Sequence, residues 1–488
     1  MQPLHILLLI GGYFILLFFI SFLTGKDDSN ETFFKAKKQS PWYLVAFGMI
    51  GATLSGVTFI SVPGMVGNQQ FAYMQGVFGF FVGTIFIVIV LLPIYYKLNV
   101  TSIYQYLEQR FGKVSYKTGA FFFLLSRVTG AAFRLFLVAI SMQYIVFATL
   151  GIPFWFTVVL SILLIWIYTF RGGIKTIVWT DTLQTLAMLT AVGVAIYLIN
   201  QKLGWSYSEF LHSTEFELKS KIFFFEDANS KMYFWKYFIG GIFIAITMTG
   251  LDQDMMQKNL TCKNKKEAQK NMITMISLLV IVNFVFLSLG ALLFIYAEKT
   301  GVQIPVVDGK TRTDLLFPEI AMNGNLGIAL SVTFIIGLIA AAYSSADSAL
   351  TSLTTSFSVD FLNIEKLPKI RQKPLRKKVH VWVSILLVIV VIIFNQLDGN
   401  VVGNLFKFAT FTYGPLLGLF AFGIFTKYKI KDRFSWLIAL LSILISYGIT
   451  QLPKSIIGEY HFFWEILPIN GLITFIGLWF IRKKQNET

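Results

Sequence analysis

The stretch TFIIGLIAAAYSSADSALTSLTTSF, residues 333–357, is long enough to span a membrane as a helix and carries polar side chains through its centre. Small and hydroxyl-bearing residues recur at helical spacing, so they line one face of such a helix. They are Ala341, Ser344, Ser345, Ser348, Ser352 and Thr355, and Asp347 borders them. A carboxylate near the middle of a bilayer costs roughly 2.5–3.5 kcal/mol, so it must face a cavity, a partner or an ion.

This pattern has two interpretations. Oxygen ligands around an acid suit a hard monovalent cation such as sodium. The alternative is a helix contact through small residues, with the hydroxyls bonded to carbonyls of their own helix. Asp347 favours the cation site, because a contact of small residues needs no buried charge.

The composition indicates an integral membrane protein. Hydrophobic residues make up 56% of the 488 residues and charged residues only 14%, which is more apolar surface than a soluble core can bury. The hydropathy pattern predicts an all-α fold with about 13 transmembrane helices. The apolar segments are residues 4–23, 42–66, 76–96, 118–148, 153–170, 174–200, 233–250, 272–298, 326–357, 379–395, 401–426, 434–452 and 462–481.

The net charge of +16 fits the same class, because of where the charges lie. Lys and Arg concentrate in alternate loops, most strongly in NIEKLPKIRQKPLRKK, residues 363–378. The positive-inside rule then predicts a multi-pass protein of the cell (inner) membrane, with the N-terminus outside and the C-terminus cytoplasmic. The basic loops would contact anionic lipid, so nucleic acid is not expected as a partner. Cys262 is the single cysteine, which excludes an intrachain disulfide.

The segment 42–66 is interrupted by glycines and by Pro63, which has no N–H to donate to a helix. In hydrocarbon, irregular backbone is tolerated where its freed carbonyls line a cavity or bind an ion. Thr53, Ser55 and Thr58 add hydroxyls at the same depth. The alternative is a kinked helix that packs through its glycines.

Two arginines lie within the segment 118–148, on roughly one face. Arg127 is close enough to the inner edge to extend toward the surface. Arg134 is deeper, and its guanidinium either binds a substrate carboxylate or pairs with a buried acid.

Two further charges enter the membrane. Asp181 lies about two turns above the inner surface, and periodicity alone leaves open a helix-end acid paired with Lys175 or Arg171. Lys407 is expected to act as a structural counter-ion.

The segment 233–250 is short, contains glycines and follows 42–66 by five spans. Interrupted spans in corresponding places of two halves indicate an inverted-repeat transporter. The halves would cross the membrane in opposite senses, because five is odd. The predicted units are an accessory helix with the first cytoplasmic loop (1–41), a first repeat (42–200), an external loop (201–232), a second repeat (233–426), and two accessory helices with a short tail (427–488).

Three motifs carry a resemblance to a known family. GGIKTIVWTDTLQ at 172–184, TGLDQDMMQKNL at 249–260 and AAAYSSADSAL at 340–350 resemble the sodium:solute symporters, which include transporters of glucose, proline, pantothenate, monocarboxylates, iodide and sialic acid. The resemblance implies the LeuT-type fold, with five-plus-five inverted repeats and alternating access.

The resemblance also implies binding residues. The shared sodium site would use the backbone carbonyls of Gly51, Leu54 and Ala341 with the hydroxyls of Ser344 and Ser345. A possible second cation would lie among Asp181, Ser344, Asp347 and Ser348, although the carboxylate at 347 stands where sialic acid members have a hydroxyl. Substrate would contact Thr53, Ser55, Thr58, Gln75 and Arg134, where the arginine corresponds to one that takes a carboxylate in those members.

The expected function is therefore sodium-coupled symport of a small organic anion, such as a sugar acid or monocarboxylate, by alternating access. The expected partners are the solute, Na⁺ and the lipid bilayer, with no obligate protein partner evident. The alternatives are proton coupling through Asp181 or Asp347, a symporter-like sensor, and a channel. An enzyme is not expected, because no paired acids or nucleophile with a base are convincingly placed.

Overall fold

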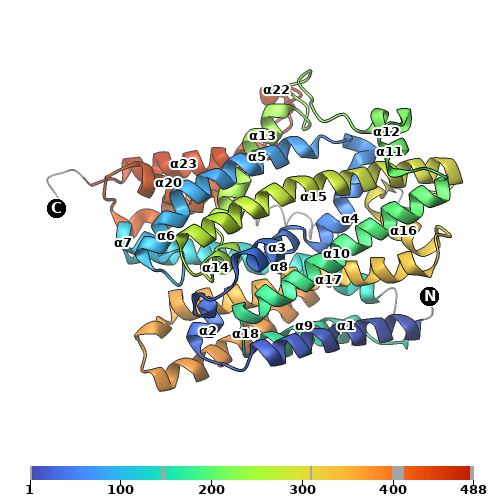
Figure 1. Cartoon of the computed structure of the whole chain (residues 1–488). Helices are drawn as coiled ribbons and strands as arrows, with labels where there is room; N and C mark the ends of the chain where they lie inside the picture. Colours follow the sequence, from blue (N-terminus) through green and yellow to red (C-terminus); the bar gives the residue numbers. More distant parts are fainter. Residues whose placement is uncertain (1–2, 144–146, 148–149, 308–309, 398–410, 484–488) are drawn as a thin grey trace.

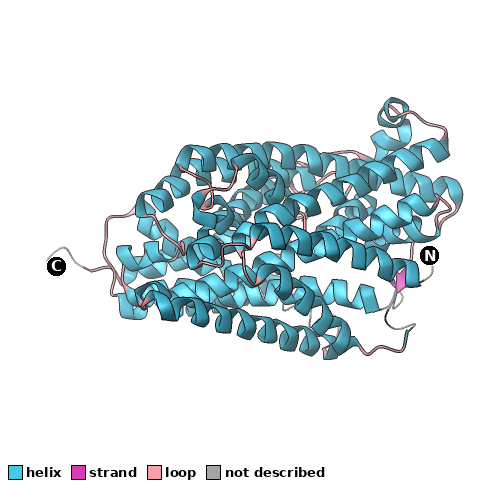
Figure 2. Ribbon diagram, turned by 60° about the horizontal axis from the view of Figure 1, so that its bottom comes forward, coloured by secondary structure: helices cyan, strands magenta, loops and turns pink. Residues whose placement is uncertain are grey.

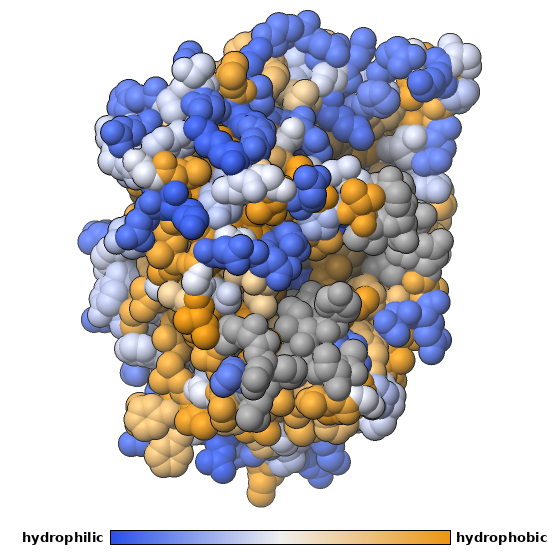
Figure 3. Space-filling model, turned by 90° about the vertical axis from the view of Figure 1, so that its right-hand side faces the viewer, coloured by the Kyte–Doolittle hydropathy of each residue, from blue (hydrophilic) through white to orange (hydrophobic). Residues whose placement is uncertain are grey.

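A computed structural model describes residues 3–143, 147, 150–307, 310–397 and 411–483. Lys407 lies outside the described residues. The described part is a bundle of helices with one short hairpin (Figure 2). In this hairpin, Val306 lies opposite Thr311. In Figure 1, α1 begins at one end of the bundle and α23 finishes at the other. Figure 3 views the end where α1 begins, and hydrophilic residues gather over the upper part of that face.

Helices account for nearly all of the regular structure in the described residues. In chain order, the elements are α1 (Pro3–Thr24), α2 (Asn30–Lys35), α3 (Trp42–Thr53), α4 (Gly56–Gln69), α5 (Tyr73–Phe86), α6 (Leu92–Leu98), α7 (Gln105–Arg110), α8 (Lys113–Met142), α9 (Phe154–Thr169), α10 (Ile174–Leu203), α11 (Tyr207–Leu211), α12 (Thr214–Lys219), α13 (Phe234–Ala245), α14 (Gln253–Asn259), α15 (Lys265–Thr300), β1 (Val306–Val307), β2 (Lys310–Thr311), α16 (Leu316–Asn323), α17 (Ile328–Ser356), α18 (Lys369–Gln396), α20 (Tyr413–Phe425), α21 (Ser435–Thr450), α22 (Lys454–Ile457) and α23 (Ile466–Phe480). Single π-helical turns follow α5, α13 and α17 at Ile87–Leu91, Ile246–Gly250 and Phe357–Phe361.

The membrane-spanning pattern matches the hydropathy prediction. Within the described residues, 8 helices are long and apolar enough to cross a membrane, and two bent pairs bring the number to 10. The three shorter apolar helices α9, α20 and α23 coincide with the remaining predicted spans. Every predicted apolar segment therefore overlaps a helix or a bent pair of helices.

Two spans are broken, and they are the two that the sequence indicates. The segments Trp42–Thr53 and Thr58–Gln69 meet at 57°, and Phe234–Gly250 meets Gln253–Asn259 at 68°. The first break lies at Leu54, whose φ of −81° and ψ of 80° end α3. Pro63 does not cause it, because this proline lies inside α4.

Side chains cap the helix after each break. Ser55 caps α4 by accepting a hydrogen bond from the Thr58 N–H at 3.5 Å. Asp252 caps α14 by accepting hydrogen bonds from the N–H groups of Asp254 at 2.8 Å and Met255 at 3.2 Å. These side chains satisfy backbone donors that each break leaves without a helical partner.

Helix α17 forms the centre of the bundle. Every residue from Gly337 to Ser356 is buried. Glycines allow its neighbours to approach closely: a Cβ added to Gly56 at the start of α4 would lie 3.4 Å from Cα of Ala342. The first broken span therefore packs directly on the helix that carries the serine stripe.

A polar cluster ties the loop after α1 to the beginning of α18. Asp28 accepts hydrogen bonds from Lys377 at 2.9 Å and Lys373 at 3.0 Å and also pairs with Arg376, whose side chain is fully buried. Burial by itself raises the pKa of Asp28, but the hydrogen bonds from Lys377, Lys373 and Arg376 outweigh it and hold the pKa below the usual value.

Replacing Asp28 with asparagine is expected to lower the melting temperature at pH 7 by about 2–4 °C, because the buried Arg376 would lose its carboxylate. The lowered pKa makes the stabilisation by Asp28 complete above its unfolded-state pKa of about 4 and lost as the pH falls through the folded-state pKa. Thermal unfolding in detergent from pH 7 to pH 3 should show the two proteins converging. A constant difference would contradict this account.

Candidate cation and solute site

The hydroxyls along α17 divide into two groups. Towards its C-terminal end, Ser352, Thr354 and Thr355 donate to backbone carbonyls of their own helix at 2.7–3.0 Å, as the alternative interpretation of the stripe expects. Towards the middle, Ser344 and Ser348 donate to carboxylates on other helices. Thr354 and Thr355 also contact other helices, through His380 at 2.9 Å and Gln257 at 2.9 Å, so it is the bonds to carboxylates that distinguish the middle of α17.

The Ser345 and Thr351 hydroxyls belong to neither group, because both are buried and have no hydrogen-bond partner among the described residues. Of the two, Ser345, which is 2% exposed, is the predicted sodium ligand. A buried hydroxyl without a partner costs about 1–3 kcal/mol, so it indicates a role outside helix packing. The other predicted sodium ligands are also buried: Gly51, Leu54, Ala341 and Ser344.

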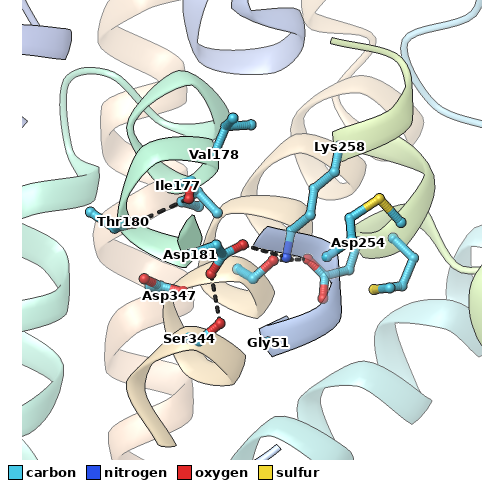
Figure 4. A network of polar contacts seen from close by, with 12 residues as sticks. Gly51, Ile177, Val178, Thr180, Asp181, Asp254, Lys258, Ser344 and Asp347 are labelled. Carbon is cyan, nitrogen blue, oxygen red and sulfur yellow. Dashed lines mark hydrogen bonds and ion pairs between the residues drawn. The ribbon is translucent and has the colours of Figure 1, made fainter. Parts of the chain in front are cut away.

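The first broken span lies against both α10 and α17. The N–H of Gly51 donates to the Thr185 hydroxyl on α10 at 3.1 Å, and a Cβ at Gly51 would lie 2.2 Å from that oxygen. Together with the approach of Gly56 to Ala342, this contact brings residues 51–56 beside the central serines of α17. Figure 4 shows Gly51 near Ser344 and Asp181.

Asp181 forms the centre of a buried polar network (Figure 4). Its Oδ2 lies 2.7 Å from Nζ of Lys258 on α14, and its Oδ1 accepts a hydrogen bond from Ser344 at 2.6 Å. The side chains of Asp181 and Lys258 are 1% and 2% exposed. The sequence-based alternative, a pair with Lys175 or Arg171, is wrong, because the partner comes from the second broken span.

Asp347 lies beside this pair but bonds to a different helix. Its Oδ2 accepts a hydrogen bond from the Tyr168 hydroxyl on α9 at 2.7 Å. Its Oδ1 has no partner among the described residues, and the side chain is fully buried. A fully buried carboxylate with one unpartnered oxygen favours a bound cation nearby.

Arg127 is held in a second ionic cluster and does not extend to the surface. Its guanidinium pairs with Asp254 and lies 3.8 Å from Asp252. Ser348 donates to Asp254, and Tyr413 donates to Asp252 at 2.7 Å. These contacts connect α8, α17 and α20 to the second broken span.

A cavity of about 1030 Å³ extends from the middle of the bundle towards the loop before α23. Thr53, Arg127, Arg134 and Thr249 line it, and so does Trp464. Arg134 makes no ion pair with a carboxylate in the described part of the chain. It is therefore available to an anion in the cavity.

The other predicted substrate contacts do not line this cavity. Ser55 and Thr58 hydrogen-bond to each other at 3.3 Å in the cap of α4. Gln75 is fully buried, its amide nitrogen donates to the carbonyls of Ala72 and Met232, and its oxygen accepts from the Phe224 N–H. These contacts give Gln75 a structural role in holding the loop after α12, which corrects the sequence interpretation.

Lys258, Tyr168 and Asp254 belong to the network but were not selected from the sequence. Lys258 and Asp254 do appear in TGLDQDMMQKNL, where they are one helical turn apart. Tyr168 gave no comparable signal, because it is one aromatic residue in an apolar helix.

The sequence is similar to those of a known family of transporters. The model for the sodium:solute symporter family matches residues 33–432, which is most of the chain. The chain belongs to this family. The symporter is 26% identical to the sodium/sialic acid symporter SiaT of Proteus mirabilis, over 86% of the chain and 82% of the relative. It is 26% identical to sodium-coupled monocarboxylate transporter 1 of Mus musculus, over 84% of the chain and 66% of the relative.

Solved structures establish the fold of the symporter. A substrate-bound, outward-open Na⁺-coupled sialic acid symporter matches with a TM-score of 0.81 at 22% identity, covering 97% of this chain and 96% of that one. The nucleobase-cation symporter Mhp1 in a closed conformation matches with a TM-score of 0.57 at 14% identity, covering 93% of each chain. These similarities confirm the predicted all-helical, LeuT-type membrane fold. The symporter is a multi-pass transporter and not an enzyme.

Proposed function

We propose that this symporter carries a small organic anion together with sodium. The sodium ion binds the carbonyls of Gly51, Leu54 and Ala341 and the hydroxyls of Ser344 and Ser345. The observation that carries the proposal is the buried Ser345 hydroxyl, which lacks a partner among the described residues beside the broken span. Carbonyls at helix breaks and inward-facing hydroxyls are typical cation ligands in transporters of this architecture.

The cavity supports an anionic solute. Arg134 lines it, and a guanidinium binds a carboxylate through two parallel hydrogen bonds. Relatives of this chain are named for sialic acid and monocarboxylates, which are both carboxylates. Thr53 also lines the cavity, so Arg134 would fix the charged end of the solute and Thr53 would contact a neighbouring polar group.

The contacts at the opposite side of the cavity suit an outward-facing state. Gln253 on α14 donates to the carbonyl of Thr101 at 2.9 Å and accepts from the Ile103 N–H at 2.9 Å. Asp360 after α17 accepts from Ser102 at 2.8 Å and Tyr116 at 2.9 Å. These hydrogen bonds hold the segment before α7 against the second broken span and α17, which closes the inner path when the N-terminus is outside.

Alternating access then follows from differential binding. Sodium joins the first broken span to α17 and stabilises the outward-facing state with its solute pocket complete. Solute binding closes the outer side, and loss of sodium to the cytoplasm weakens the pocket. Because the coupling is a difference in affinity between states, sodium and solute raise each other's affinity by the same factor.

Uptake into proteoliposomes tests the proposal. Radiolabelled sialic acid, lactate and glucose are offered under an inward gradient of sodium or of potassium at constant pH. We expect saturable uptake of at least one carboxylate with sodium and little with potassium. Uptake that follows a proton gradient and ignores sodium would favour the proton-coupled alternative. Conductance without saturable uptake would favour a channel.

A further inference from the structure

The predicted second cation position already contains a positive charge. Of its four expected ligands, Asp181 is paired with the Lys258 ammonium at 2.7 Å, and Ser344 donates to the other oxygen of Asp181 at 2.6 Å. Ser348 donates to Asp254, which in turn pairs with Arg127. Asp347 Oδ1 is the one carboxylate oxygen of this set that has no partner among the described residues.

We propose that the Lys258 ammonium is a tethered cation that replaces a second sodium ion, so that this symporter carries one sodium ion in each cycle. The inference rests on the proposed function, because it concerns the number of ions and not sodium coupling itself. A side-chain ammonium gives Asp181 the charge that a free ion would supply. It also loses no translational freedom on binding, because it is covalently attached.

The local charges agree with a single ion. In their charged forms, Asp181, Asp347 and Lys258 carry a net charge of −1, which one sodium ion neutralises. Ser344 and Ser345 lie on the same turn of α17 as Asp347, so a sodium ion at these serines would lie close to the remaining negative charge. A second free ion beside Lys258 would instead meet a buried positive charge, which disfavours its binding.

Lys258 reaches Asp181 across the two halves of the fold. It lies on α14, just after the second break, whereas Asp181 lies on α10 and Ser344 on α17. Figure 4 shows the lysine extending from α14 to the carboxylate. Removing the ammonium would therefore leave a vacant position bordered by carboxylate and hydroxyl oxygens, which are suitable ligands for sodium.

The test measures binding of radioactive sodium to the purified full chain in detergent. We expect one ion for each wild-type chain, two for Lys258→Met, and one for Lys258→Arg, which keeps the charge. The double variant Asp181→Asn with Lys258→Met should also bind one ion, because both members of the pair are absent. Two ions on the wild type would overturn the inference, as would one ion on a folded Lys258→Met variant.

A second measurement covers the case in which Lys258→Met folds poorly. Its melting temperature should be several degrees below that of the wild type in choline chloride, because Asp181 lacks its partner. In sodium chloride the deficit should disappear as sodium occupies the vacant position. A deficit that sodium does not reduce would contradict the inference. A wild type that binds no sodium would instead overturn the proposed function.

Discussion

Replacing Ser345 with alanine is expected to raise the sodium concentration for half-maximal thermal stabilisation by about 10- to 100-fold, which is the loss typical of altered metal sites. The melting temperature measured in choline chloride should not fall below the wild-type value and should rise, because the variant no longer buries an unpartnered hydroxyl. The Ser345 hydroxyl is buried and has no partner among the described residues, so its removal breaks no described hydrogen bond. Titration of the melting temperature with sodium chloride, at constant ionic strength, measures both quantities.

Ser352→Ala provides the matched control. Ser352 lies two turns further along the same stripe, is buried to 1% exposure, and donates to the Ala349 carbonyl at 3.0 Å. Removing the Ser352 hydroxyl should leave the sodium concentration for half-maximal thermal stabilisation unchanged. If Ser345→Ala also titrates like the wild type, Ser345 is not a ligand, and the unpartnered hydroxyl needs another explanation.

The fold could be predicted from the sequence because its signals are local. A bilayer requires about 20 apolar residues for each helix, and glycine-rich interruptions mark broken spans, so hydropathy and breaks together indicated the architecture. Pro63 shows the limit of this reasoning. It has the strongest intrinsic tendency to break a helix, yet the chain turns at Leu54, and Pro63 continues within α4.

The site could be predicted only in part, because its charges pair over long distances in the chain. The sequence predicts Asp181 as an acid within the membrane and offers Lys175 or Arg171 as its partner, whereas the structure pairs it with Lys258 on α14. Lys258 follows a short apolar span in the sequence, where a lysine is typical of a cytoplasmic loop and does not indicate a buried partner. Gln75 shows that a polar residue in the sequence does not reveal where its side chain points, because its amide bonds to backbone of the loop after α12 and does not line the cavity.

Replacing Arg134 with methionine is expected to raise the half-saturating concentration of the transported anion by about 30-fold or more. Losing a charge that binds a carboxylate directly in a desolvated site costs about 2–5 kcal/mol, and 1.4 kcal/mol corresponds to a factor of ten. Arg134→Lys should lose about tenfold, since lysine keeps the charge without the paired donors of a guanidinium. The rate of uptake is measured at increasing anion concentration under an inward sodium gradient, and it gives the half-saturating concentration of each variant.

Sodium binding separates this loss from misfolding. Arg134 lines the cavity and pairs with no carboxylate in the described part of the chain, so the sodium-dependent thermal shift of Arg134→Met should match the wild type. Arg127→Met should behave differently, with lower stability in every salt, because it leaves the buried Asp254 and Asp252 without their cation. An Arg134→Met protein that transports the anion with wild-type half-saturation would show that the carboxylate binds elsewhere in the cavity.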